Sequence, residues 1–132
     1  MKKTIVVLLM LFSVGISATE FKPYPLAEIT KEEWGTYFER VSQAFPKTAQ
    51  DHPEQHLIVY FNNKYRLSYA FTKEGHPAHP AWVTRQVVEA EGTIDMVQIG
   101  YFAGNEEPFA ILFRQYQQLT EQTKANMRAS SK

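Results

Sequence analysis

The sequence predicts an α+β fold: a four-stranded antiparallel sheet, in the order α-β-β-β-β-α, with both helices packed on one face. Two helical patterns of apolar residues, over residues 30–45 and 105–127, enclose two pairs of strand-like segments, over residues 57–72 and 81–102. Antiparallel sheets commonly bury one face and leave the other in contact with solvent. We therefore expect one sheet face to carry the core and the other to remain open.

The first helix is expected to begin at Thr30 and to end before Pro46. Thr30 and Glu33 have the spacing of a capping box, in which each side chain accepts a hydrogen bond from the other residue's backbone. Apolar residues then recur at three- and four-residue intervals: Trp34, Tyr37, Phe38, Val41 and Phe45. Such a stripe is typical of a helix face turned toward a core.

Residues 57–61 and 64–72 are predicted to form a β-hairpin around Asn62-Asn63, because Asn tolerates the positive φ of a two-residue turn. In that register Phe61 faces Lys64, and successive side chains alternate between the faces. The core face would then carry Ile58, Tyr60, Tyr65, Leu67, Tyr69 and Phe71. The opposite face would combine Leu57, Val59 and Phe61 with Lys64, Arg66 and Ser68.

The second half of the chain predicts a loop, another hairpin and a closing helix. Gly75, Pro77 and Pro80 indicate a loop over residues 73–80. Residues 81–90 and 93–102 are expected to pair around Glu91-Gly92, in a register that the broken alternation leaves open. Asn105 is a suitable cap for a helix that runs to about Met127. Its apolar stripe consists of Phe109, Leu112, Phe113, Tyr116 and either Leu119 or Thr120.

The N-terminal residues predict export. Lys2 and Lys3 precede an apolar run and a small-residue stretch, so residues 1–18 are interpreted as a signal peptide. Cleavage after Ala18 and after Ser17 both remain open. The apolar run is too short for a membrane span, so we expect no stable membrane anchor after cleavage. Residues 19–29 are predicted to form an extended N-terminal arm that packs on its own domain, reaches a neighbouring molecule or is disordered, and residues 30–132 are predicted to form a single α+β domain. The predicted location is periplasmic or secreted.

Composition excludes several partners and chemistries. The chain has no cysteine, so disulfides, thiolate metal sites and cysteine nucleophiles are absent. Without Lys2 and Lys3, 12 basic residues face 14 acidic ones, which gives a net charge of −2 with neutral histidines. Basic residues nowhere form a cluster larger than a pair of neighbours. The sequence therefore predicts no nucleic acid partner and no patch for anionic lipid.

The open sheet face is the predicted partner-binding surface. Apolar residues rimmed by charge often mark interfaces, and this face offers Leu57, Val59, Phe61, Lys64 and Arg66. We expect a small non-enzymatic binding protein that recognises a macromolecular partner through this face or the adjoining loop edge. The partner would be another envelope or secreted protein, or a second copy in a homodimer. Inhibitor, immunity and assembly roles remain equally open.

The alternative prediction is a metal or small-ligand site at the histidine-rich end of the sheet. In the predicted register, position 52 lies opposite position 73, which gathers His52, His56, His76 and His79. Imidazole nitrogens suit Zn²⁺ or Cu²⁺, the only cofactors that the sequence suggests. A rigid exposed loop explains the same His-Pro pairs without a metal.

Catalytic motifs are absent from the sequence. None of the serines after residue 18 lies in a nucleophile elbow: Ser42, Ser68, Ser130 and Ser131. The carboxylate groups around residues 89–95 and 106–107 fit turn and helix-cap roles. There is no glycine-rich phosphate loop. A non-enzyme is therefore the favoured interpretation.

Residues 86–90, Gln-Val-Val-Glu-Ala, resemble the Gln-x-Val-x-Gly loop of cystatins, a family in which a long helix lies on an antiparallel sheet. The likeness covers five residues. Ala90 stands in place of the family's glycine, and the segment is predicted as the third strand. No cystatin function is carried over to this chain.

Overall fold

The computed structural model describes residue 24 and residues 26–130. The element order is a helix, five strands and a second helix, with two single-turn 3-10 helices flanking the first strand. The predicted signal peptide and most of the predicted arm lie outside the described residues. Within the described part of the chain, no helix combines the length and the apolar character needed to cross a bilayer.

Helix α3, Lys31–Ala44, confirms the first predicted helix. Both bonds of the capping box are present: Glu33 N donates to Thr30 Oγ1 (3.0 Å) and Thr30 N to Glu33 Oε1 (2.9 Å). The predicted stripe faces the sheet, where Trp34 lies edge-on against Phe71 and Tyr37 edge-on against Trp82. The helix is thus held by aromatic packing along one side.

The sheet has five strands in the order β1-β2-β3-β4-β5, all antiparallel, and not the four that the sequence predicted. They are β1 Gln50–His52, β2 Leu57–Asn62, β3 Leu67–Thr72, β4 Ala81–Ala90 and β5 Thr93–Phe102. The additional strand, β1, pairs with β2 and lies between η1 (Pro46–Thr48) and η2 (Pro53–Gln55). Its three residues are polar and exposed, so no hydrophobic pattern marks it.

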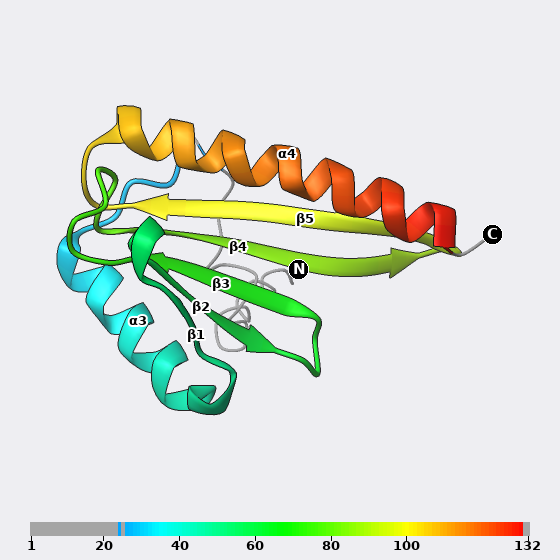
Figure 1. The fold of residues 1–132 in the computed structure, drawn as a ribbon, viewed down its shortest axis with the longest axis horizontal. Coiled ribbons are helices and arrows are strands. Elements are labelled where there is room, and N and C mark those ends of the chain that lie inside the picture. Colours follow the sequence, from blue (N-terminus) through cyan, green and yellow to red (C-terminus); the bar gives the residue numbers. More distant parts are fainter. Residues whose placement is uncertain (1–23, 25, 131–132) are drawn as a thin grey trace, which may run out of the picture.

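The two helices pack on opposite faces of the sheet, which corrects the prediction that both share one face. Neighbouring residues of β4 and β5 join different core clusters. Trp82 and Tyr101 pack with α3, whereas Val83 and Phe102 pack with Phe109 of helix α4, Glu106–Ser130. Because successive strand residues point to opposite sides, one helix covers each face. We name these the α3 face and the α4 face. Figure 1 shows α4 running along β5, well apart from α3.

The first hairpin forms, but its register differs from the prediction by four residues. Phe61 pairs with Ser68 and not with Lys64. Asn62 O accepts a hydrogen bond from Tyr65 N (3.2 Å), and Arg66 takes a positive φ of 52°, so the turn is longer than Asn62-Asn63. A shift by an even number preserves the faces. Ile58, Tyr60, Leu67, Tyr69 and Phe71 therefore still share one face, and only Tyr65 leaves it.

The second hairpin confirms the prediction, and the structure supplies its register: Ala81 pairs with Phe102 and Ala90 with Thr93. Glu91 and Gly92 both have positive φ, at 55° and 77°, as a two-residue hairpin turn requires. Residues 86–90, which resemble the cystatin loop, lie within β4. The segment between β3 and β4 is a loop, as predicted.

The described part of the arm packs against the domain. Ile29 N donates to Phe102 O (2.8 Å), and Phe102 N donates to Ala27 O (3.1 Å). Tyr24 lies edge-on against Phe109 and donates from its hydroxyl to Glu106 Oε2 (3.0 Å). These residues cover the outer edge of β5 and anchor the start of α4.

Candidate functional site

The α4 face of the sheet is only partly covered by its helix. Strand pairing lays Phe61, Ser68, Arg85 and Gln98 across this face in one row, and Val59, Ala70, Val83 and Gly100 in the next. Helix α4 packs on the β4 and β5 side of these rows. On the β2 and β3 side, Val59, Phe61 and Ser68 remain half-buried. We call Val59, Phe61 and Ser68 the open strip; Ala70, opposite Val59, is buried at 3% exposure.

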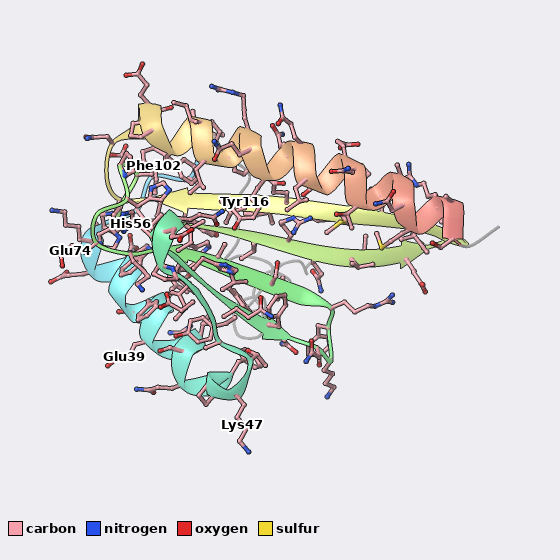
Figure 2. All side chains as sticks on the ribbon, viewed as in Figure 1. Glu39, Lys47, His56, Glu74, Phe102 and Tyr116 are labelled. Carbon is pink, nitrogen blue, oxygen red and sulfur yellow. The ribbon has the colours of Figure 1, made fainter. Side chains whose placement is uncertain are left out.

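A groove of about 390 Å³ lies between α4 and the end of β2 nearest to η2. Its apolar lining comprises Leu57, Leu112, Tyr116 and Leu119, and we call it the α4 groove. Leu119 is 44% exposed. Figure 2 shows Tyr116 on the side of α4 that faces the sheet. Leu57 and Val59 are two residues apart on the same side of β2, so the groove and the open strip are neighbours on the α4 face.

Arg85 lies where the open strip meets helix α4. Its Cα partner in β3 is Ser68. Its Nε donates to Thr120 Oγ1 (2.9 Å), its Nη2 approaches Thr123 Oγ1 (3.4 Å), and its guanidinium lies 5.8 Å from the centre of the Tyr116 ring. Burial lowers the pKa of the Arg85 guanidinium from its ordinary value. A partly desolvated cation thus borders the strip.

A polar network holds Arg85 in place from the α4 side. Thr120, which is 4% exposed, donates to Gln98 Oε1 (2.7 Å), and Gln98 Nε2 donates to Phe113 O (2.9 Å). The choice that the sequence left open is thereby decided: Thr120 is the buried member of the helix stripe, and Leu119 is exposed. Burial raises the pKa of the Tyr116 hydroxyl, and the positive charge of Arg85 partly opposes that rise.

The structure brings together three of the five predicted partner-binding residues. Leu57, Val59 and Phe61 share the α4 face, but Leu57 is 6% exposed because it packs with α4. Lys64 and Arg66 lie in the β2–β3 turn. Arg66 pairs with Glu89 at 3.7 Å, and Lys64 lies over the Tyr65 ring. Of the predicted set, Val59 and Phe61 therefore remain as the partly exposed apolar residues, and Lys64 and Arg66 lie in the turn at one end of them.

The structure brings together three of the four predicted histidines: His56, His76 and His79 lie around the β3–β4 loop, whereas His52 does not lie opposite position 73. His52 lies in β1 opposite Leu57, because β1 pairs with β2 and the register places Thr72 opposite Leu57. His56 lies against Gly75, and it is labelled beside that loop in Figure 2. His76 Nδ1 accepts a bond from Ala78 N (2.9 Å), and His79 Nδ1 lies 2.8 Å from Thr72 Oγ1.

His76 and His79 are held by contacts within the fold. The ring of His79 packs edge-on against Trp34. Burial, followed by the charges of His56 and His79, lowers the pKa of His76, and burial lowers that of His79. Among the residues that the structure describes, no group of three or more His, Cys, Asp or Glu side chains is placed to hold a metal ion.

Comparison with protein-family models, with curated proteins and with solved structures finds no match to this chain. The candidate site therefore stands on its geometry. Sequence reasoning missed Arg85, Tyr116 and Thr120 as members of this site, and no motif marks them. Only the pairing of β3 with β4 and the position of α4 bring these three side chains to the edge of the open strip.

Proposed function

We propose that this protein is a small exported binding protein without enzymatic activity, and that the open strip and the α4 groove receive a segment of a polypeptide partner. The supporting observation is the half-buried state of Val59 and Phe61 beside the exposed Leu119 of α4. Apolar side chains that a domain leaves partly exposed in a concave surface are typical of binding sites.

The extent of the surface favours a polypeptide over a small molecule. Half-buried Val59 and Phe61 lie two residues apart along β2, and the α4 groove adds Leu57 and Leu119. An extended segment or one helical turn that presents apolar side chains fits such a surface.

A matched pair of valine substitutions tests this proposal. Val59→Lys places a charge in the open strip, whereas Val97→Lys places one at a 43% exposed valine that pairs with Gln86 on the α3 face. We expect Val59→Lys to abolish partner capture from envelope extract, or self-association in sedimentation, and Val97→Lys to leave both unchanged. Thermal unfolding of both variants checks that they are folded.

Hydrogen exchange and the capture or self-association measurements decide the outcome. Hydrogen exchange should show protection of the backbone amides of residues 57–61 when the partner is bound. If the protein remains a monomer, captures nothing, and behaves identically with either valine substituted, the binding proposal is wrong.

The proposal includes export, which rests on Lys2, Lys3 and the apolar run that follows them. When the full chain is expressed in a bacterial host, mass spectrometry of the periplasmic fraction should find a protein shortened by 17 or 18 residues. Recovery of the intact chain from the cytoplasm alone would contradict export without affecting the binding surface.

A further inference from the structure

Arg85 is a partly buried cation that no carboxylate neutralises within the part of the chain that the structure describes. Its contacts are the hydroxyls of Thr120 and Thr123 and the ring of Tyr116, all of them uncharged. Removing a charge from water is costly, so buried charges in proteins usually have a partner of opposite sign. Arg85 departs from that pattern.

Carboxylates are available nearby but are used elsewhere. Lys124, one helical turn beyond Thr120, pairs with Asp95 at 3.2 Å and with Glu121 at 3.2 Å. Arg66 pairs with Glu89. The carboxylate side chains of these pairs are exposed. Arg85 is instead half-buried on the α4 face, in the row that also contains Ser68 and Gln98. Arg85 therefore lies at the edge of the open strip without a carboxylate partner among the described residues.

The guanidinium retains capacity for a further bond. Nε and Nη2 are directed at α4, and Nη1 makes no hydrogen bond to another described residue. The bonds from α4 and the Tyr116 ring fix the plane of the guanidinium. An arginine oriented in this way is suited to a carboxylate, because its remaining N–H groups are already positioned and little conformational entropy is lost on binding.

We propose that Arg85 binds a carboxylate of an acidic polypeptide segment whose neighbouring apolar side chains lie on Val59, Phe61 and Tyr116. This inference rests on the proposed function and adds the chemical class of the partner. The charge next to the strip supports an acidic segment, since Lys64 lies in the turn next to Phe61 and its ammonium group contacts only the Tyr65 ring among the described residues, whereas Arg66 is already paired with Glu89. A partner carboxylate would supply the counterion that Arg85 lacks.

Two peptides that differ in one group test the proposal on the full chain. The first is acetyl-Phe-Leu-Glu-Leu-Phe-amide, and the second carries Gln in place of Glu. Binding is measured by nuclear magnetic resonance, through the Nε–Hε signal of Arg85, which is assigned by its loss in Arg85→Gln. We expect the Glu peptide to bind about fivefold more tightly, the modest gain of a partly exposed ion pair, and to shift this signal.

Arg85→Gln should remove the difference between the peptides, and Arg114→Gln, at an exposed position of α4, should preserve it. The affinities of the two peptides are compared on the wild-type protein and need no variant; if Arg85→Gln folds poorly, the Arg85 signal is assigned instead with Arg85→Lys, which also lacks the guanidinium. Equal affinity for both peptides, or no effect of either on the Arg85 signal at millimolar concentration, overturns the inference. Acetate that binds as tightly as the Glu peptide would also overturn it, because Arg85 would then be a site for free anions.

These results separate this inference from the proposed function. If both peptides bind equally and Val59→Lys abolishes their binding, the strip binds polypeptide and Arg85 has only a structural role. If neither peptide binds and Val59→Lys changes no other property, both proposals fail together.

Discussion

Phe109 of α4 lies directly above Gly100 of β5, with no space for a side chain between them. A Cβ atom at Gly100 would lie 2.6 Å from Phe109 Cζ and 2.8 Å from Phe113 Cδ1. Phe109 is fully buried and stacks on Phe102 with ring centres 5.1 Å apart. This close contact sets the distance between α4 and the sheet, and thereby the depth of the α4 groove.

Gly100→Ala should destabilise the protein. The added methyl group must displace two buried rings, and overpacking of this kind costs about 1–3 kcal/mol of the free energy of unfolding. Urea denaturation followed by circular dichroism measures the loss. Gly35→Ala is the matched control, because Gly35 is inside α3 and a Cβ atom there would meet nothing within 4 Å. It should stabilise by about 0.5–1 kcal/mol through helix propensity. Similar effects at the two glycines would contradict the close α4 packing.

Thr30→Ala should weaken the start of α3. The substitution removes the hydroxyl that accepts Glu33 N, and loss of such a cap costs about 1 kcal/mol. Thr36→Ala removes a hydroxyl of the same helix that donates back to Glu32 O (3.1 Å) and should be neutral or slightly stabilising. Chemical denaturation of the two variants compares them. Equal loss from both would mean that the capping box contributes no stability.

Thr72→Val should be costly although it preserves side-chain shape. Thr72 is 1% exposed, and its hydroxyl accepts Ala81 N (2.9 Å) and donates to Ala81 O (3.1 Å). Valine leaves a buried N–H unpaired, at about 1–3 kcal/mol. Thr84→Val, at a buried threonine with a single 3.3 Å bond to Ile99 O, should cost less. Thermal unfolding measures the loss of stability in both variants. A larger loss in Thr84→Val than in Thr72→Val would contradict the role of the Thr72 hydroxyl in holding Ala81.

The stability of the fold should decrease on mild acidification. Because the pKa values of His76 and His79 are lowered from 6.5 in the folded protein, the unfolded chain takes up protons at a higher pH than the folded one. The free energy of unfolding therefore falls as the pH drops through the interval below 6.5. Urea midpoints across this interval measure the decrease.

A double variant identifies the groups responsible. His76→Asn with His79→Asn keeps an amide that can donate or accept a hydrogen bond near each Nδ1 position but cannot be protonated, so the stability of the double variant should vary less with pH. His52→Asn, in the exposed strand β1, should retain the wild-type dependence. If the double variant and the wild type lose stability in parallel, carboxylates and not these histidines govern the acid response.

Local sequence patterns predicted the existence of both helices and the strand faces of the first hairpin correctly. The capping box at Thr30, the stripe from Trp34 to Phe45 and the turn at Glu91-Gly92 are all present. The first hairpin was predicted in the wrong register, yet its faces are right because the shift is even. Face assignment depends only on alternation along a strand, whereas register depends on which turn the tertiary contacts favour.

The number of strands and the placement of the helices were not predictable in the same way. Strand β1 has no apolar residue and is specified by its pairing with β2. Large apolar residues on both faces of β4 and β5, such as Trp82 beside Val83, require a helix on each side. The same packing buries Leu57 and leaves Val59 and Phe61 as the apolar part of the site.

The sequence by itself determined where both helices begin, the strand alternation of the first hairpin and the apolar residues of the open strip, because these follow from contacts between residues close together in the chain. Only the tertiary structure decided that Arg85, Thr120 and Tyr116 meet at its edge, since they come from two elements more than 30 residues apart. Periodicity assigns a residue to a face, but the packing of α4 on the sheet determines which charges on that face remain without a partner.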